Sequence, residues 1–268
     1  PLPRLVRASC LVLVLLCTGC SGDGDSPFRF ERLAVRDTVT HAIALDGRTL
    51  VLQAEVGRID VTGSDTATVA TVQVVRTARG ATEGSARQRL GRGEVVRIDG
   101  DDEIVQVIAP APQPPGIETA FAALVPAEAR LYLQLDEGAI TLAGAGGPTV
   151  TAQTGKGTIR AEALASDTTT LSATAGGVEA VVAALAPQAR LIVAVEEGRV
   201  EVDLPADTAA ELDAASGTGL VSVDGFSSAS TDRAETETGQ RVTGRVGGAS
   251  RARVEARVGV GTVTVRGR

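Results

Sequence analysis

Residues 259–265 read GVGTVTV, and residues 136–142 read DEGAITL. Aligned on Gly261 and Gly138, both stretches place a β-branched residue second after the glycine, a polar residue third and an apolar residue fourth. Apolar and polar side chains that alternate with a period of two are typical of a β-strand with one buried face. The same local structure is therefore predicted in two distant parts of the chain.

The pattern occurs seven times in the sequence. The aligned glycines are Gly57, Gly138, Gly157, Gly176, Gly198, Gly219 and Gly261. The second residue after each glycine is Ile59, Ile140, Ile159, Val178, Val200, Val221 and Val263. The third residue is polar and the fourth is apolar in every copy. We predict that the residues second after the glycines face a shared core, where they form one ladder.

The alternation also extends upstream of each glycine, with a change of phase. Residues seven, five and three positions before the glycine are mostly apolar, as in Leu50, Leu52 and Ala54. The inward positions are thus odd offsets before the glycine and even offsets after it. A one-residue slip needs a bend or bulge, and glycine can adopt a positive φ there without steric cost. The seven glycines are therefore predicted to be structural corners, each joining two strands.

The spacing of the glycines distinguishes between β architectures. Successive intervals from Gly138 to Gly219 are 19, 19, 22 and 21 residues, and Gly219 is followed by Gly261 after 42 residues. We interpret the long interval as two steps, with a degenerate repeat near Gly239 or Gly244. Equivalent positions that recur about every 20 residues predict an all-β, parallel β-solenoid, β-helix-like, in which coils stack on one another. An antiparallel β-sandwich is the alternative.

The regular repeats do not cover the whole chain. We predict repeats over 131–268 and a more elaborate N-terminal β portion of the same domain over 39–130. Within this portion, ATVATVQVVR, GEVVRI and EIVQVIA predict longer strands, and SARQRLG at 85–91 predicts a helical turn.

Composition limits the possible partners. The 268 residues carry a formal net charge of −7, and 43% of them are hydrophobic, but only 2% are aromatic. A core of this kind must be built from aliphatic side chains and threonine. The acidic balance argues against nucleic acid as a partner, because phosphate binding needs a basic surface.

The N-terminus has the features of a targeting segment. Two arginines in PLPRLVR precede the apolar run ASCLVLVLLC, which is too short to span a bilayer. The sequence TGC at 18–20 resembles the bacterial lipoprotein lipobox, although Cys17 stands where that motif usually has leucine. The resemblance implies a signal peptide over 1–19, lipidation of Cys20 and a polar tether over 20–38. We therefore expect a lipid-anchored, extracytoplasmic protein of the cell envelope.

The repeat segments resemble a known family. LQLDEGAITLAG, TAQTGKGTIRAE, VAVEEGRVEVDLP and EARVGVGTVTVRG are similar to segments of the bacterial putative adhesins, which are built of degenerate β-strand repeats. The resemblance spans roughly residues 39–268. It implies a β-helix-like domain at the cell surface and a role in adhesion, with no catalytic motif.

Two isolated motifs could carry chemistry but lack the necessary companions. His41 is the only histidine, and one histidine supplies neither a zinc site nor a catalytic triad. The sequence TGKGT at 154–158 lacks the Ser or Thr and the upstream glycine of a phosphate-binding loop. We interpret it as part of a strand corner.

Acidic residues gather in two further places. The pairs Asp136, Glu137 and Glu196, Glu197 each precede a corner glycine, three coils apart. At about 4.8 Å per coil the pairs are separated by roughly 14 Å, whereas glycosidase carboxylates lie about 5 to 9.5 Å apart. DGDDE at 99–103 could bind calcium weakly, but it lacks the ligand spacing of an EF-hand loop.

The sequence thus predicts a non-catalytic binding, adhesion or scaffolding protein, with no catalytic residues, metal site or cofactor. Its expected partners are the membrane, through the lipid anchor, and an envelope protein or polysaccharide. A carbohydrate-active β-helix enzyme is the alternative. Such an enzyme would need clustered carboxylates and aromatic platforms, and Tyr132 is the one aromatic residue expected to point outward from the repeats.

Overall fold

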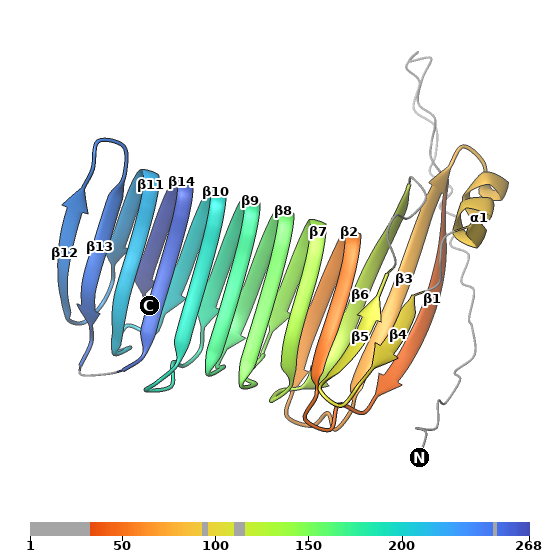
Figure 1. Cartoon of the computed structure of the whole chain (residues 1–268), viewed down its shortest axis with the longest axis horizontal. Coiled ribbons are helices and arrows are strands. Elements are labelled where there is room, and N and C mark those ends of the chain that lie inside the picture. The colour runs from red at the N-terminus through yellow and green to blue at the C-terminus, as the bar shows by residue number, and fades with distance from the viewer. Residues whose placement is uncertain (1–32, 93–95, 110–115, 249–250) are drawn as a thin grey trace, which may run out of the picture.

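A computed structural model describes residues 33–92, 96–109, 116–248 and 251–268 (Figure 1). Cys20 and the expected signal peptide lie outside these residues. The described chain forms one mixed, mostly parallel sheet of 14 strands and one helix. The elements in chain order are β1 (Leu33–Ile43), β2 (Thr49–Ser64), β3 (Ala70–Gly80), α1 (Glu83–Arg92), β4 (Arg97–Gly100), β5 (Ile104–Ile108), β6 (Ile117–Pro126), β7 (Arg130–Ala143), β8 (Thr149–Leu164), β9 (Thr168–Val182), β10 (Arg190–Leu204), β11 (Ala210–Asp224), β12 (Ala229–Glu235), β13 (Gln240–Val246) and β14 (Arg253–Gly267).

Seven long parallel strands make up the centre of the sheet, in the order β2, β7, β8, β9, β10, β14 and β11 (Figure 1). They pair in register, so that the seven glycines form one continuous column: Gly57, Gly138, Gly157, Gly176, Gly198, Gly261 and Gly219. The alternation of buried and exposed residues changes phase at this column, as the sequence pattern predicts. Neighbouring repeats thus stack in parallel.

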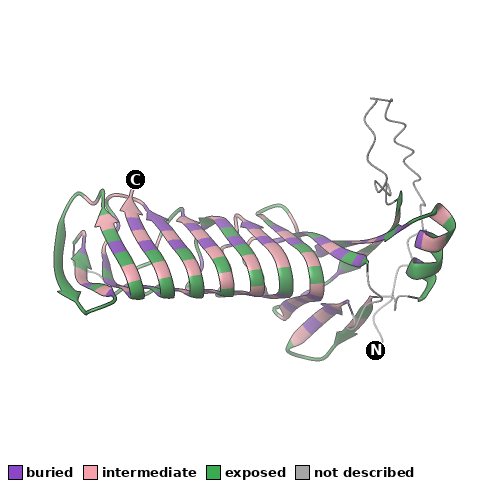
Figure 2. Cartoon of the chain, turned by 90° about the horizontal axis from the view of Figure 1, so that it is seen from above, coloured by how far each residue is buried: buried purple, intermediate pink, exposed green. Residues whose placement is uncertain are grey.

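The core lies between the two halves of the bent strands. It contains residues from before the glycines, such as Leu50 and Leu52, and residues from after them, such as Ile59 and Val61. The second residues after the glycines form one row in which no member is more than 3% exposed. In Figure 2 these buried positions appear as bands that alternate with exposed ones along each strand. The outward side chains therefore form two long polar faces.

The C-terminal strand corrects the expected order of the repeats. β14 lies between β10 and β11 and pairs in parallel with both. The expectation of a degenerate repeat near Gly239 or Gly244 is therefore wrong, and Val221 does not follow Val200 directly in the row of core residues. Val263 lies between these two valines. The residues between β11 and β14 include the antiparallel hairpin of β12 and β13, so the long interval is an excursion to the end of the sheet and back.

Further strands extend the sheet at both ends of the parallel stack: β5 and β6 are parallel to β2, whereas the strands beyond β6 and beyond β11 pair antiparallel. At one end β2 pairs with β5 along its first half and with β6 along its second half. The strands β3 and β1 extend the sheet beyond β6, and α1 packs against them through Leu90. β1 begins at Leu33, within the segment expected to be a tether, because its backbone pairs with β3 over its whole length. At the other end β13 pairs with the first half of β11.

The glycine column permits a closer approach than any other residue would allow. All seven glycines have φ between +129° and +150°. A Cβ atom added to Gly157 would lie 1.7 Å from the carbonyl oxygen of Gly138, and one added to Gly198 would lie 1.7 Å from that of Gly176. Each carbonyl thus occupies the space that a side chain of the next glycine would need. A single methyl group would force two adjacent strands apart.

The glycine column yields a stability prediction. Gly157→Ala should destabilise the protein by at least about 3 kcal/mol, because it combines positive-φ strain with a clash against backbone. Gly84→Ala in α1 is the matched control, since the atom nearest to its added Cβ would be the Thr82 hydroxyl oxygen at 3.9 Å. This control should change stability by less than about 1 kcal/mol. Urea denaturation would measure both, and equal effects would contradict the proposed role of the column.

The core row yields a second prediction. Ile159 is 1% exposed, so Ile159→Ala should cost about 2 to 5 kcal/mol of unfolding free energy. Its neighbour Arg160 lies on the outer face and pairs with the exposed carboxylates of Glu162 and Glu179. Arg160→Ala should therefore stay within about 0.5 kcal/mol of the wild type. A larger loss at Arg160 than at Ile159 in the same measurement would reverse the inferred orientation of β8.

Candidate functional site

The residues singled out from the sequence are distributed over separate parts of the sheet. His41 lies in β1, opposite Val72 of β3, and partial burial lowers the pKa of its imidazole. The segment 154–158 is part of β8 and spans its corner at Gly157. The acidic pairs lie on β7 and β10, with β8 and β9 between them. None of these residues is brought together into one site.

The acidic segment 99–103 forms the turn between β4 and β5. One carboxylate oxygen of Asp101 accepts hydrogen bonds from the backbone N–H groups of Glu103 and Ile104, both at 2.8 Å. These backbone hydrogen bonds lower the pKa of Asp101. Within the described ranges, no group of three or more histidine, cysteine, aspartate or glutamate residues is placed to hold a metal ion.

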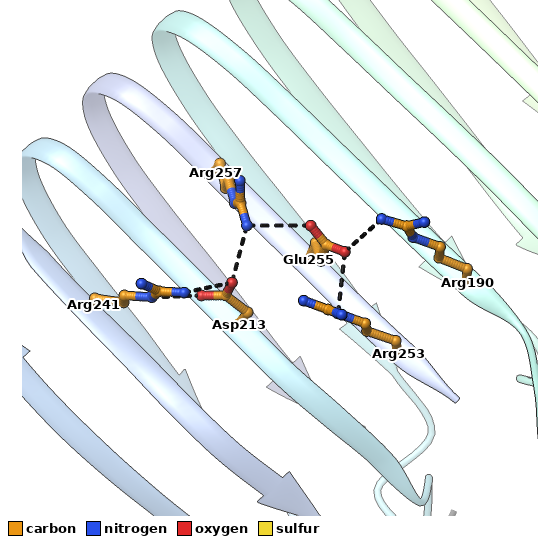
Figure 3. A network of polar contacts seen from close by, with 6 residues as sticks. All are labelled: Arg190, Asp213, Arg241, Arg253, Glu255 and Arg257. Atoms are coloured by element: carbon orange, nitrogen blue, oxygen red, sulfur yellow. Dashed lines mark hydrogen bonds and ion pairs between the residues drawn. The ribbon is translucent and has the colours of Figure 1, made fainter. Parts of the chain in front are cut away.

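The most developed polar cluster lies on the outer face formed by the first halves of β10, β14 and β11, together with β13 (Figure 3). Two carboxylates, Asp213 on β11 and Glu255 on β14, have side chains that are only 8% exposed. Arg241 binds Asp213 through two nitrogen atoms, at 2.8 and 2.9 Å. Arg257 lies between the carboxylates and contacts Asp213 at 3.0 Å and Glu255 at 3.2 Å.

Two further arginines bind Glu255 from the opposite side. Arg190 on β10 contacts it at 2.9 Å, and Arg253 on β14 contacts it at 3.1 Å (Figure 3). A peripheral pair, Arg245 on β13 and Glu211 on β11, lies 3.3 Å apart on the same face. We call these eight residues the arginine grid: Arg190, Glu211, Asp213, Arg241, Arg245, Arg253, Glu255 and Arg257.

The strand register explains the arrangement of the grid. Arg190, Arg253, Glu211 and Arg245 are paired across adjacent strands and form one row. Glu255 and Asp213 form the next row, two residues further along β14 and β11. Arg257 and Arg241 lie on the far side of this row. Both pair with Ala215 of β11, Arg257 from β14 on one side of that strand and Arg241 from β13 on the other. The row of buried carboxylates is thus enclosed by arginines on both sides.

The electrostatics of the grid favour its charged state. The hydrogen bonds from Arg241 are the largest cause that lowers the pKa of Asp213, and the hydrogen bond from Arg257 lowers it further. The carboxylate of Asp213 in turn raises the pKa of Arg241. Five arginines and three carboxylates leave an excess of two positive charges on a protein whose net charge is −7.

One shallow hollow adjoins the grid, and a second lies within it. One, of about 390 Å³, extends across β7 to β10, where Gln134, Gln153, Thr174 and Glu196 line it, and Arg257 lines its edge toward the grid. The other, of about 360 Å³, lies over β11 and β13 beside Arg241, Arg245 and Arg253. Grid and hollows together make one polar surface that runs across the strands.

The sequence pattern does not predict the grid, although it contains part of the signal. Asp213 and Glu255 each lie six residues before a corner glycine, at an outward position of the repeat. Their strands are separated in sequence by the β12 and β13 hairpin. The carboxylates become neighbours only because β14 inserts beside β11, which the glycine spacing did not reveal.

Comparison with solved structures finds putative adhesins. A "putative cell adhesion protein" from Clostridium sporogenes superposes with a TM-score of 0.52 at 12% identity, and the match covers 87% of this chain and 100% of that chain. A "putative adhesin" from Bacteroides fragilis matches with a TM-score of 0.39 at 10% identity, over 85% of this chain and 96% of that chain. No family model and no curated protein sequence matches. The likeness to the Clostridium protein shows a shared fold.

The buried carboxylate of Asp213 yields a pH prediction. Its lowered pKa means that its charge stabilises the folded state above the ordinary carboxyl value of about 3.9, and that this contribution is lost as pH falls through the lower folded value. Asp213→Asn should therefore lose about 1 to 2 kcal/mol at pH 7, because its arginine partners are half exposed, and less at pH 3. Urea denaturation at pH 7, 4 and 3 would measure this difference.

Asp232→Asn, on the exposed strand β12, is the control. It should match the wild type at every pH. A constant penalty for Asp213→Asn from pH 7 to pH 3 would show that the charge of Asp213 is not the cause.

Proposed function

We propose that this protein is a non-catalytic adhesin of the bacterial cell envelope, held at the membrane by a lipidated Cys20. The observation that carries the proposal is the likeness of its fold to the putative cell adhesion protein from Clostridium sporogenes, along the whole of that chain. Adhesion needs a stable, exposed surface and no reactive group. A long sheet with continuous outer faces provides such a surface.

The bent strands support a solenoid as the architecture of this surface. Each central strand contributes one half to either side of the core, and each repeat advances the stack by one strand. We propose that these repeats are coils of a parallel β-solenoid. In such a stack the core and the outer faces lengthen together, and like residues of successive coils form rows that an extended partner can follow.

Cys20 and the residues after it support the proposed location. Cleavage before Cys20 would leave a lipidated N-terminus, followed by the polar, glycine-rich SGDGDS. Two or three acyl chains make membrane anchoring stable. Among the described residues, no helical segment combines the length and hydropathy that a membrane span requires.

The separation of the acidic pairs favours binding over catalysis. Asp136, Glu137 and Glu196, Glu197 lie on strands three steps apart in the sheet, which corresponds to roughly 14 Å. Glycosidase carboxylates must lie about 5 to 9.5 Å apart to act on one bond. These acidic pairs are better placed to interact with solvent beside the corner glycines.

The proposal predicts that Cys20 controls both location and adhesion. Cys20→Ser should abolish acyl labelling and move the protein from the membrane fraction to the secreted fraction or leave its signal peptide uncleaved. Cells that carry this variant should adhere to a polysaccharide-coated surface no better than cells that lack the protein, whereas wild-type cells should adhere in larger numbers. Ser21→Ala, which retains Cys20, is the matched control and should adhere like the wild type.

Two results would oppose the proposal. Equal adhesion of wild-type cells and cells that lack the protein would exclude an adhesive role. Release of reducing ends from a polysaccharide by the purified wild-type protein would indicate an enzyme instead.

A further inference from the structure

We propose that the arginine grid binds an acidic polysaccharide whose sugar units carry carboxylates, such as a polyuronate. This inference rests on the proposed adhesive function and assigns it a ligand class and a surface. A guanidinium group matches a carboxylate with two parallel hydrogen bonds, which makes arginine well suited to this recognition.

The arginines of the grid retain donors for such a ligand. Arg257 uses one terminal nitrogen for both of its carboxylate contacts, Arg190 uses one terminal nitrogen, and Arg253 uses its Nε. A guanidinium group has five N–H donors, so most donors of these three side chains make no contact with protein among the described residues. Their side chains are 51 to 54% exposed, and the free donors are accessible from solvent.

Buried carboxylates hold the arginines in place before a ligand arrives. Asp213 and Glu255 contact four guanidinium groups (Figure 3), and the side chains of these four arginines are still 51 to 57% exposed. Long flexible side chains that are already ordered lose less conformational entropy on binding. Asp213 and Glu255 need charged partners because they are buried, but one arginine would balance each carboxylate, and four arginines contact the two.

The surroundings of the grid favour a sugar polymer over a small anion. From Arg257 the adjoining hollow passes in turn over Ser172 on β9, Gln153 on β8 and Gln134 on β7, with Thr174 also in its lining. Amide and hydroxyl groups of this kind form hydrogen bonds with sugar hydroxyls. A chain lying across the strands could therefore place its carboxylates on the grid and its hydroxyl groups in the hollow.

The same surroundings disfavour nucleic acid. The surface is bordered by acidic residues, Asp136 and Glu196 in the hollow and Asp232 on β12, opposite Thr243 of β13. Double-stranded DNA carries one negative charge per about 1.7 Å of its length, so many phosphates would be close to these carboxylates. A polysaccharide with one charge per sugar unit would bring fewer negative charges close to these carboxylates.

The test measures the affinity of the purified full-length protein for polygalacturonate and for its fully methyl-esterified form. The wild type should bind polygalacturonate at least about tenfold more tightly than the ester, because esterification removes the charged partner of the guanidinium groups. Binding should weaken as salt is raised. Comparable affinity for both polymers, or no binding to polygalacturonate at low salt, would overturn the inference.

Arg190→Gln combined with Arg257→Gln is the informative variant. It leaves Glu255 paired with Arg253, and Asp213 paired with Arg241, so neither buried carboxylate loses its last arginine. Affinity for polygalacturonate should fall at least about tenfold. Urea denaturation of the same preparation would establish that the variant is folded.

Arg58→Gln combined with Arg160→Gln is the matched control. These arginines lie after the corner glycines, on the other outer face, and each contacts a carboxylate at 2.7 Å. The control removes the same charge and should leave affinity within about twofold of the wild type. Equal losses in both variants would mean that net charge, and not the grid, determines binding.

Two further outcomes separate this inference from the adhesive function. Cells that adhere through the protein although polygalacturonate does not bind would refute the inference and leave the adhesive function intact. Tighter binding to single-stranded DNA than to polygalacturonate would assign the grid to a different class of polymer and overturn the inference.

Discussion

The contact between consecutive glycines is the constraint on which the rest of the structure depends. Along the column, the carbonyl oxygen of one glycine fills the space where a side chain of the next would begin, as at Gly138 and Gly157. Seven strands can bend at the same level only because no side chain is present there. This common bend lets both halves of every strand cover one core, and it keeps the outward residues of neighbouring strands in straight rows. The arginine grid depends on these rows, because they bring charged side chains of neighbouring strands next to one another.

The repeat was predictable from sequence because a single physical requirement recurs in it. A strand with one buried face must alternate apolar and polar side chains, and a bend must interrupt that alternation. Gly138, Ile140 and the residues around them therefore indicate both the strand and its bend. The parallel register of β7, β8, β9 and β10 follows from it. The position of β14 cannot be predicted from the repeat, because its pattern fits equally well on either side of β11. The spacing alone therefore predicts two coils in the long interval before Gly261, where the structure has a hairpin and a returning strand.

The candidate site was harder to predict for the same reason. Asp213 and Glu255 are ordinary outward residues of their own repeats, and neither has a partner of special spacing in the sequence. Their burial results from the arginines of three different strands, β10, β13 and β14, which surround them only after those strands are paired. His41 and the segment 99–103 are isolated motifs in the sequence. The structure uses the Asp101 carboxylate to close a turn, a role that short-range sequence cannot distinguish from weak ion binding.

The insertion of β14 also has a consequence for the order of folding. The ribosome synthesises β11, β12 and β13 before β14, so β11 has no parallel neighbour when it first emerges. The strands from β7 to β10 can stack as they are made, whereas β11 must wait for a segment that is translated later. Its pairing with β14 joins residues 42 positions apart, as Gly219 and Gly261 are, and contacts between distant residues form slowly. Completion of the stack is therefore a late event, and the grid, which spans this junction, forms only when the stack is complete.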